Sequence, residues 1–196
     1  MPDSRPKNIA VPKKWRGEIA QILISERKIK NRVRTLAQEV SESFAGRDLV
    51  IVSLLNGTVM FLADLIRHLS LPLRLDFIGV SSYGDKTTSG ELVFTKELGL
   101  DVRNRDVLLV DDILDTGKTL DRVLRKLHRL GPKQIKVCVF LEKKARRIKD
   151  VEADFVGFTI PDLFVVGYGL DYAERYRNLP FVGVLQPSLY ATSPST

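Results

Sequence analysis

The sequence contains a single cysteine, Cys138, and only two histidines, His68 and His128. One cysteine cannot form a disulfide within the chain, and so few sulfur and imidazole ligands exclude a structural zinc site. No apolar run approaches the ~20 residues of a membrane helix, and the first residues lack the apolar core of a secretory signal. We therefore expect a protein that is neither exported nor inserted in a membrane. Cys138 lies in the aliphatic run IKVCVFL, which predicts a buried thiol and favours the cytoplasm.

Acidic residues are outnumbered, because 31 lysines and arginines against 24 aspartates and glutamates give a net charge of +7. This excess fits either a nucleic-acid partner or an enzyme that handles polyanionic small molecules. Five of the basic residues lie among prolines within 1–20. We predict a flexible basic extension over 1–20, a single domain over 21–187 and a loose tail over 188–196.

Apolar periodicity alternates between helical and extended spacing along the chain. The predicted helices span 26–45, about 61–69 and 117–130, and the predicted strands span 48–55, 73–80, 107–111, 135–141, 155–158, 164–167 and 181–185. This alternation is typical of an α/β fold with a mostly parallel sheet. Residues 81–105 show little pattern and predict a long mobile loop. Because ligands bind beyond the carboxyl ends of parallel strands, we expect 56–58, 111–119 and 142–147 to lie on one rim.

The run VLLVDDILDTGKT at 107–119 leads a hydrophobic strand into three aspartates and then into a turn suited to phosphate. The turn opens the predicted helix, whose free N–H groups and dipole favour an anion. A Walker A loop is excluded, because it needs a glycine five residues before Gly117 and that position is Asp112. Carboxylates beside a phosphate site are suitable partners for sugar hydroxyls, directly or through Mg²⁺. The motif thus predicts a sugar phosphate with free hydroxyls, together with a metal.

This motif resembles the segment by which type I phosphoribosyltransferases bind phosphoribosyl pyrophosphate (PRPP). The stretches SSYGD, LEKKARR and IPDLFVVGYGLDY resemble the hypoxanthine (hypoxanthine-guanine) branch of that superfamily, and the similarity runs from about Ile22 to Leu185. The resemblance implies a mostly parallel sheet flanked by helices, with a small hood region and a mobile active-site loop. It also implies Mg²⁺-dependent transfer of the 5-phosphoribosyl group from PRPP to hypoxanthine or guanine, giving IMP or GMP and pyrophosphate.

The resemblance implies a role for each matching residue of this chain. Asp115 would be the acid–base residue that faces purine N7. The contacts to PRPP and nucleotide would come from Asp111, Asp112, Asp115, Thr116, Gly117, Lys118 and Thr119. The purine would be bound by Lys143, Phe164, Val165 and Asp171, and pyrophosphate by Asn56, Gly57 and Arg177. The metal would be held by Asp111, Asp112 and Asp171, while Ser82 and Tyr83 would lie on the mobile loop.

The sequence departs from the family pattern at two positions. Relatives commonly have Lys-Gly where this chain has Asn56-Gly57, and we hypothesise a weaker positive charge there, offset by Arg177 or Arg147. Many relatives also have proline at the position of Lys144, so the turn after Lys143 has a different local restraint.

Three functions fit these observations to different degrees. A PRPP-sensing regulator that binds RNA or DNA is supported by the charge of +7, and a phosphoribosyltransferase specific for xanthine or a pyrimidine is another alternative. A regulator would not need Asp115, Lys143, Phe164 and Asp171 together. We therefore expect an enzyme with small-molecule substrates and no nucleic-acid partner, and the resemblance implies a homodimer or homotetramer.

Overall fold

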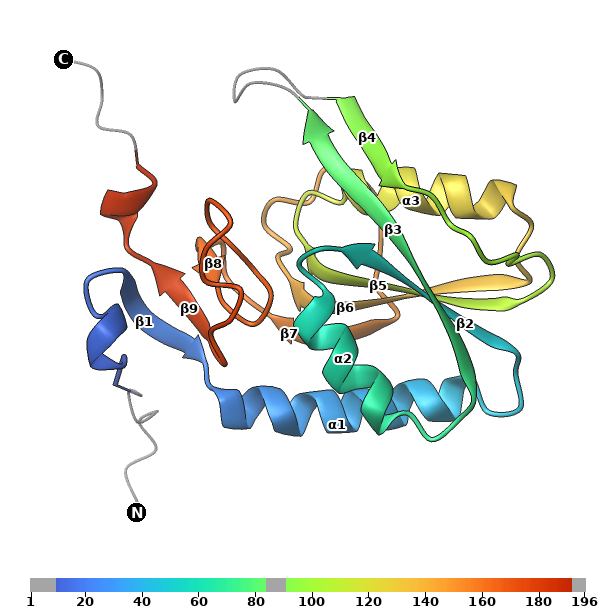
Figure 1. Cartoon of the computed structure of the whole chain (residues 1–196), viewed down its shortest axis with the longest axis horizontal. Coiled ribbons are helices and arrows are strands. Elements are labelled where there is room, and N and C mark those ends of the chain that lie inside the picture. Colours follow the sequence, from blue (N-terminus) through green and yellow to red (C-terminus); the bar gives the residue numbers. More distant parts are fainter. Residues whose placement is uncertain (1–9, 84–90, 192–196) are drawn as a thin grey trace. The chain divides into compact units, whose positions relative to one another are not determined.

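The computed structural model describes residues 10–83 and 91–191. It forms two compact units: a terminal unit, Met1–Asn31 with Leu163–Thr196, and a central unit, Arg32–Asp162. Figure 1 shows the elements, which are η1 (Lys13–Trp15), β1 (Ile19–Ile24), α1 (Glu26–Ser43), β2 (Leu49–Leu55), α2 (Val59–His68), β3 (Leu73–Tyr83), β4 (Glu91–Lys96), β5 (Asp106–Leu114), α3 (Lys118–Arg129), β6 (Gln134–Glu142), β7 (Phe155–Thr159), β8 (Val165–Val166), β9 (Val182–Leu185) and η2 (Pro187–Leu189).

The central unit is a six-stranded sheet with the order β4-β3-β2-β5-β6-β7. All neighbouring pairs are parallel except β3 and β4. Val123 of α3 packs with Val50 of β2 in one hydrophobic cluster, whereas the ring of Phe61 in α2 lies 5.3 Å from that of Phe140 in β6. Helices therefore cover both faces, as Figure 1 shows for α3 on one side and α2 on the other. The predicted α/β fold with a mostly parallel sheet is confirmed.

The carboxyl ends of β2, β5 and β6 lie at the same edge of this sheet, because the three strands are parallel neighbours. The predicted rim is therefore present. The predicted end of the strand at residue 111 is wrong, since β5 continues to Leu114. Asp111 pairs with Val139 and Leu114 with Glu142, so the ladder with β6 holds the chain extended past the aspartates.

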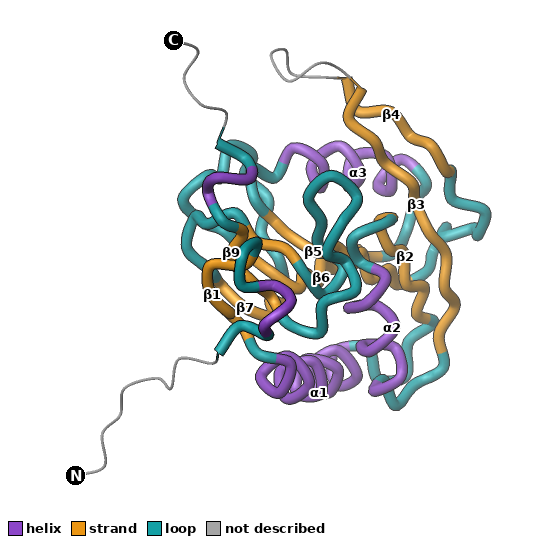
Figure 2. The backbone as a smooth tube through the Cα atoms, turned by 60° about the vertical axis from the view of Figure 1, so that its left-hand side comes forward, coloured by secondary structure: helices purple, strands orange, loops and turns teal. Residues whose placement is uncertain are grey.

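The prediction of a single long loop over 81–105 is also wrong. β3 continues to Tyr83, and β4 over Glu91–Lys96 pairs with it antiparallel, with Ser82 opposite Leu92 and Tyr83 opposite Glu91. The two strands run side by side in Figures 1 and 2. Phe94 packs against the hydrophobic cluster of the sheet, which explains why a segment with few apolar residues forms a strand. Residues 84–90 of the expected loop lie outside the described residues.

The terminal unit contains a three-stranded antiparallel sheet with the order β1-β9-β8. Residues from both ends of the chain form it, because Ile19 pairs with Leu185 and Val165 with Val184. Its core consists of Ile19, Val166, Tyr176, Leu179, Phe181 and Leu185. The strand β1 was not predicted, and the expected boundary at residue 20 falls inside it. The tail expected from residue 188 likewise begins inside η2.

Two further expectations concern the interior and the membrane. Cys138 is fully buried in β6, as predicted, and burial raises the pKa of its thiol. None of the helices in the described ranges has the length and apolarity that a membrane crossing requires.

Candidate active site

The predicted phosphate turn lies at the junction of β5 and α3. β5 ends at Leu114 and α3 begins at Lys118, so only three residues connect them. Gly117 has a left-handed φ of 80°, and a Cβ there would lie 3.2 Å from the carbonyl of Lys149. The first N–H groups of a helix have no partner within it and lie at its positive end, which suits an anion. The structure thus gathers at this helix start the residues Thr116, Gly117, Lys118 and Thr119.

Main-chain hydrogen bonds fasten the turn to the segment that follows β6. The N–H groups of Ile148 and Lys149 both donate to the carbonyl of Thr116, at 3.0 and 3.1 Å. The N–H of Lys143 donates to the carbonyl of Leu114 at 2.9 Å. Because these bonds join main chain to main chain, the phosphate turn and the segment after Lys143 form one supported structure.

Arg147 holds the same two segments through its side chain. Its Nε donates to the carbonyl of Asp115 at 3.0 Å, and its two terminal nitrogens donate to the carbonyl of Val151 and to the carboxylate of Glu142 at 3.3 Å. The side chain is only 19% exposed. All three guanidinium nitrogens are therefore engaged within the central unit. The hypothesis that Arg147 supplies charge to a pyrophosphate is not supported by this arrangement.

Asp111 and Asp112 lie near the carboxyl end of β5, where the strand still pairs with β6. Asp111 is buried, and its Oδ1 accepts a hydrogen bond from the N–H of Asp112 at 2.9 Å. Burial, together with the neighbouring charge of Asp112, raises the pKa of Asp111 well above its usual range. Two adjacent carboxyl groups at the end of a strand offer several acceptor oxygens close together. Oxygens of this kind suit hydroxyl donors or a cation.

The acid pair offers few protein ligands to a metal ion. Across residues 10–83 and 91–191, no three His, Cys, Asp or Glu side chains gather closely enough to hold an ion by themselves. The pair therefore suits an ion that takes only one or two protein ligands. Mg²⁺ binds in this manner, with the remaining positions filled by water and by substrate phosphates. The donor set fits Mg²⁺ that arrives with a phosphorylated ligand.

The Asn56-Gly57 turn follows β2 and lies against the acid pair. A Cβ on Gly57 would be 1.6 Å from Oδ2 of Asp112, so no side chain fits at this position unless the carboxylate moves. The peptide between Leu55 and Asn56 is cis. Glycine at position 57 is thus required by the approach of Asp112.

Asp115 carries a carboxylate oxygen that no described residue satisfies. Its Oδ1 is buried without a hydrogen-bond partner among the described residues, whereas its Oδ2 lies 3.5 Å from a guanidinium nitrogen of Arg146. An unsatisfied buried acceptor costs about 1–3 kcal/mol, and such groups in folded proteins call for an explanation. A ligand that donates a hydrogen bond or a proton to Asp115 provides one.

Lys143 comes directly after β6, and its side chain is buried although it belongs to the basic run LEKKARR. Its Nζ lies 3.5 Å from Oδ1 of Asp162, which leaves the ion pair long. An ammonium has three donors, so Lys143 retains capacity for a ligand carbonyl.

In the terminal unit, Phe164 and Val165 lie at the start of β8, where Val165 pairs with Val184 of β9. The side chain of Phe164 is 36% exposed. An exposed ring held by a strand suits stacking on a flat ligand. Because β8 pairs with β9, the main-chain N–H and C=O groups of Val165 have a fixed orientation.

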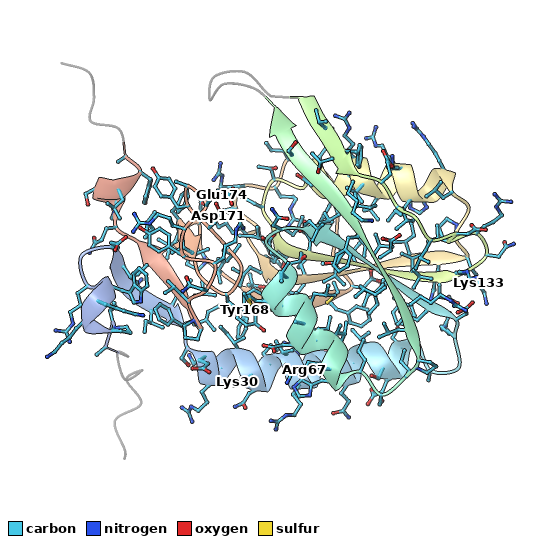
Figure 3. All side chains as sticks on the ribbon, in the orientation of Figure 1. Lys30, Arg67, Lys133, Tyr168, Asp171 and Glu174 are labelled. Carbon is cyan, nitrogen blue, oxygen red and sulfur yellow. The ribbon has the colours of Figure 1, made fainter. Side chains whose placement is uncertain are left out.

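Asp171 and Arg177 contact each other within the loop between β8 and β9. The guanidinium of Arg177 lies 3.0 Å from Oδ1 of Asp171 and 3.0 Å from Oε2 of Glu174, and it donates to the carbonyl of Gly169 at 2.9 Å. Figure 3 shows Asp171 and Glu174 together on this loop. A pyrophosphate that binds Arg177 would share its guanidinium with these carboxylates.

The candidate residues are thus divided between the units. The central unit carries Asn56, Gly57, Ser82, Tyr83, Asp111, Asp112, Asp115, Thr116, Gly117, Lys118, Thr119 and Lys143, and the terminal unit carries Phe164, Val165, Asp171 and Arg177. Ser82 and Tyr83 lie at the end of β3 rather than within a loop. The holding role of Arg147 was not predicted, because in the basic run LEKKARR nothing distinguishes it from a solvated cation.

Comparisons with known proteins agree with this geometry. The phosphoribosyl transferase domain family matches residues 20–173. A hypoxanthine-guanine phosphoribosyltransferase of Bacillus subtilis is 45% identical over 174 residues, which are 88% of this chain and 97% of the relative. A bifunctional protein TilS/HprT of Listeria monocytogenes is 41% identical over 94% of this chain, but the chain spans only 29% of that relative's length. A crystal structure of a Staphylococcus aureus hypoxanthine phosphoribosyltransferase has a TM-score of 0.87 at 40% identity, covering 93% of this chain and 100% of the other.

Proposed function

The chain belongs to the phosphoribosyltransferase family, and from this premise we propose that it transfers the 5-phosphoribosyl group of PRPP to hypoxanthine, guanine or both. The products are IMP or GMP and pyrophosphate, which makes the reaction a purine salvage step. The observation that carries the proposal is the buried, unsatisfied Oδ1 of Asp115 between the acid pair and the Gly117 turn in sequence. Joining a base to a sugar phosphate requires sugar-hydroxyl acceptors, a phosphate site and a proton acceptor, and 111–119 offers all three.

The sugar phosphate is proposed to bind along 111–119. Asp111 and Asp112 accept hydrogen bonds from the vicinal ribose hydroxyls, which reduces the electrostatic repulsion between the two carboxyl groups. The N–H groups at the start of α3 bind the 5′-phosphate, and the hydroxyls of the two threonines add donors. The residues proposed for the phosphate are Asp115, Thr116, Gly117, Lys118 and Thr119.

Mg²⁺ is the proposed cofactor, held by Asp111 and Asp112 and, for a second ion, by Asp171. When bound, it neutralises charge on the pyrophosphate group. Oδ1 of Asp171 pairs with Arg177, so a cation bound by Asp171 would share this carboxylate with the guanidinium. Asn56, Gly57 and Arg177 are the proposed contacts to pyrophosphate.

The purine is proposed to meet four residues. Phe164 stacks on the ring, and the main chain of Val165 contacts its edge. Lys143 donates to the 6-oxo group, and because a 6-amino group cannot accept from an ammonium, Lys143 selects hypoxanthine and guanine over adenine. Asp171 is the remaining proposed residue near the base.

Proton transfer and charge stabilisation are the proposed catalytic contributions of the chain. Asp115 accepts the proton that the purine loses at N7 as N9 attacks the anomeric carbon, a contribution of about 10²–10⁴ in rate. As the bond to pyrophosphate breaks, the ribose gains oxocarbenium character, and Asp111 and Asp112 stabilise its positive charge. Ser82 and Tyr83 are proposed to take part in excluding water, which would otherwise hydrolyse the activated sugar.

The cellular setting follows from the same proposal. PRPP and purine bases are small cytoplasmic metabolites, so we place the protein in the cytoplasm with no nucleic-acid partner. A homodimer or homotetramer is proposed from the resemblance.

A spectrophotometric assay with Mg²⁺, PRPP and separate bases tests the function. We expect turnover of hypoxanthine or guanine and none of adenine or uracil. Turnover of xanthine or a pyrimidine alone would reassign the substrate. Absence of turnover combined with tight RNA binding would support a regulator instead.

A further inference from the structure

Three aromatic rings of the terminal unit meet at the edge of its sheet. The ring of Tyr190 stacks on that of Phe164 with 4.7 Å between centroids and 22° between planes. Tyr172 meets Phe164 at 89°, with 5.5 Å between centroids. Both Phe164 and Tyr190 remain 36% exposed. One face of Phe164 is therefore covered by the chain itself, while part of the ring stays accessible.

The segment that carries Tyr190 is fastened to the same sheet. Tyr190 follows η2, which begins two residues after β9 ends at Leu185. The hydroxyl of Tyr172 donates to the carbonyl of Leu189 at 2.8 Å. The N–H of Leu185 donates to the carbonyl of Phe164 at 2.9 Å. The stack is thus held at both partners by hydrogen bonds that do not involve the rings.

A phenyl ring binds a flat ligand best when its orientation is already fixed, because ordering it on binding costs free energy. An offset ring behind it restricts rotation and adds stacking energy. We propose that Tyr190 is a positioning residue for base binding: it backs Phe164 so that the opposite face of Phe164 receives the purine. This inference rests on the proposed function, in which Phe164 stacks on the base.

The proposal makes a different prediction from a competing arrangement. If Tyr190 instead occupied the face that the purine needs, its removal would free that face and strengthen base binding. If the stack only stabilised the fold, its removal would leave the Michaelis constants for both substrates unchanged. The direction of the change in KM for the base therefore decides between the three.

The test compares Tyr190→Ala with the wild type in steady-state assays over hypoxanthine, guanine and PRPP concentrations. We expect KM for the base to rise about threefold to tenfold, the equivalent of one aromatic pair. We expect kcat and KM for PRPP to stay within about twofold of wild type, since the phosphate turn is not touched. A fall in the base KM, an unchanged base KM, or an equal change in both Michaelis constants would overturn the proposal.

Three further variants distinguish positioning of Phe164 from a simple loss of folding. Tyr190→Phe keeps the ring and should restore wild-type values, whereas Leu189→Ala removes an exposed apolar side chain from the same turn and should change neither KM. Tyr172→Phe removes the hydroxyl that holds the carbonyl of Leu189 and should raise the base KM by less than Tyr190→Ala does. A wild type without turnover on any base would refute the proposed function and this inference with it. An active wild type with unaffected variants would refute the inference alone.

Discussion

The segments 111–119 and 164–177 are both proposed to bind parts of one reaction, but the chain builds them by different means. In 111–119, main-chain bonds dominate: the β5 ladder reaches Leu114, and α3 begins four residues later. In 164–177, main-chain hydrogen bonds such as that from the N–H of Gly169 to the carbonyl of Arg177 are joined by side-chain ion pairs and by uncommon backbone conformations. Non-glycine residues with positive φ occur there at Tyr168, Ala173, Glu174 and Tyr176.

This difference predicts which substitutions each segment should tolerate. A turn held by its main chain keeps its shape when surface side chains vary, so substitutions in 111–119 should act on chemistry directly. A loop held by contacts such as Arg177 with Asp171 and Glu174 depends on the side chains themselves. Left-handed residues other than glycine persist only when their surroundings hold them in place. Substitutions in 164–177 should therefore alter ligand binding by changing the conformation of the loop.

Replacing Asp115 by asparagine should have the largest effect on the main-chain-held segment. The change preserves size but removes the proton acceptor, so kcat should fall by about 10²-fold or more while GMP still binds. Steady-state kinetics and calorimetry would measure the two quantities. Asp121→Asn, in the first turn of α3, is the matched control and should remain active. A nearly normal kcat in Asp115→Asn would show that the base is another residue.

Replacing Gly57 by alanine tests whether a shift of the Asp112 carboxylate, without any change in its chemistry, is enough to lower activity. The added Cβ would meet Oδ2 of Asp112 at 1.6 Å, and displacement of a catalytic group by about 1 Å can cost about 10²-fold. We expect kcat/KM for PRPP to fall by about 10-fold to 100-fold. Gly17→Ala is the control, because no atom lies within 4 Å of its added Cβ. Equal activity of both variants would contradict the close approach of Asp112.

Replacing Asn56 by lysine should lower KM for PRPP, and the effect should be smaller than the losses expected for Asp115→Asn and Gly57→Ala. Arg147 is engaged with the main chain and Arg177 with two carboxylates, so neither arginine offsets the missing cation. A partly exposed charge pair contributes about 1 kcal/mol or less, so KM for PRPP should fall by at most about fivefold. Asn56→Gln controls for side-chain length. The prediction fails if both variants give the wild-type KM.

Replacing Asp76 by asparagine should leave kinetics unchanged and alter stability only. Burial raises the pKa of Asp76, but hydrogen bonds from Lys96 and from the N–H groups of Phe77, Leu100 and Gly99 outweigh it and lower the pKa to about 2. Because the folded pKa lies below the unfolded one, the stabilisation is present above about pH 4 and is lost as the pH falls through 2.

Urea unfolding at several pH values would measure this effect. The variant should be less stable than wild type by about 2 kcal/mol at pH 7, and the difference should shrink between pH 4 and pH 2. Asp150→Asn, an exposed carboxylate, should show no comparable difference. A difference in the free energy of unfolding between variant and wild type that does not change with pH would mean that packing, rather than the charge of Asp76, stabilises this position.

The fold and the position of the turn 115–117 were predictable because their signals are local. A continuous aliphatic run, an acid pair and Thr-Gly-Lys-Thr follow one another between 107 and 119, and together they indicate a strand that leads through a short turn into a helix. The extension of β5 through Asp111 could not be predicted, since carboxylates are poor strand formers and only pairing with β6 holds them there. The strand β4 was missed for a similar reason, because pairing with β3 decides it.

The terminal unit was less predictable because its contacts join distant parts of the chain. β1 forms by pairing with β9, more than a hundred residues away, which no local pattern indicates. The stack of Tyr190 on Phe164 and the bonds of Arg147 to main-chain carbonyls also depend on folding. Family resemblance named Phe164 and Lys143, but it did not indicate which residues hold them.

The hydrogen bonds between the phosphate turn and the segment after β6 have an evolutionary consequence. Because main-chain bonds and the Arg147 side chain join the two segments, a substitution in one of them should shift the local geometry of the other. Neighbouring substitutions of this kind are not additive. If the proposed role of Lys143 holds, a lineage that acquires a new base preference through Lys143 should therefore show compensating replacements in 115–117, so that the two segments diverge as a pair.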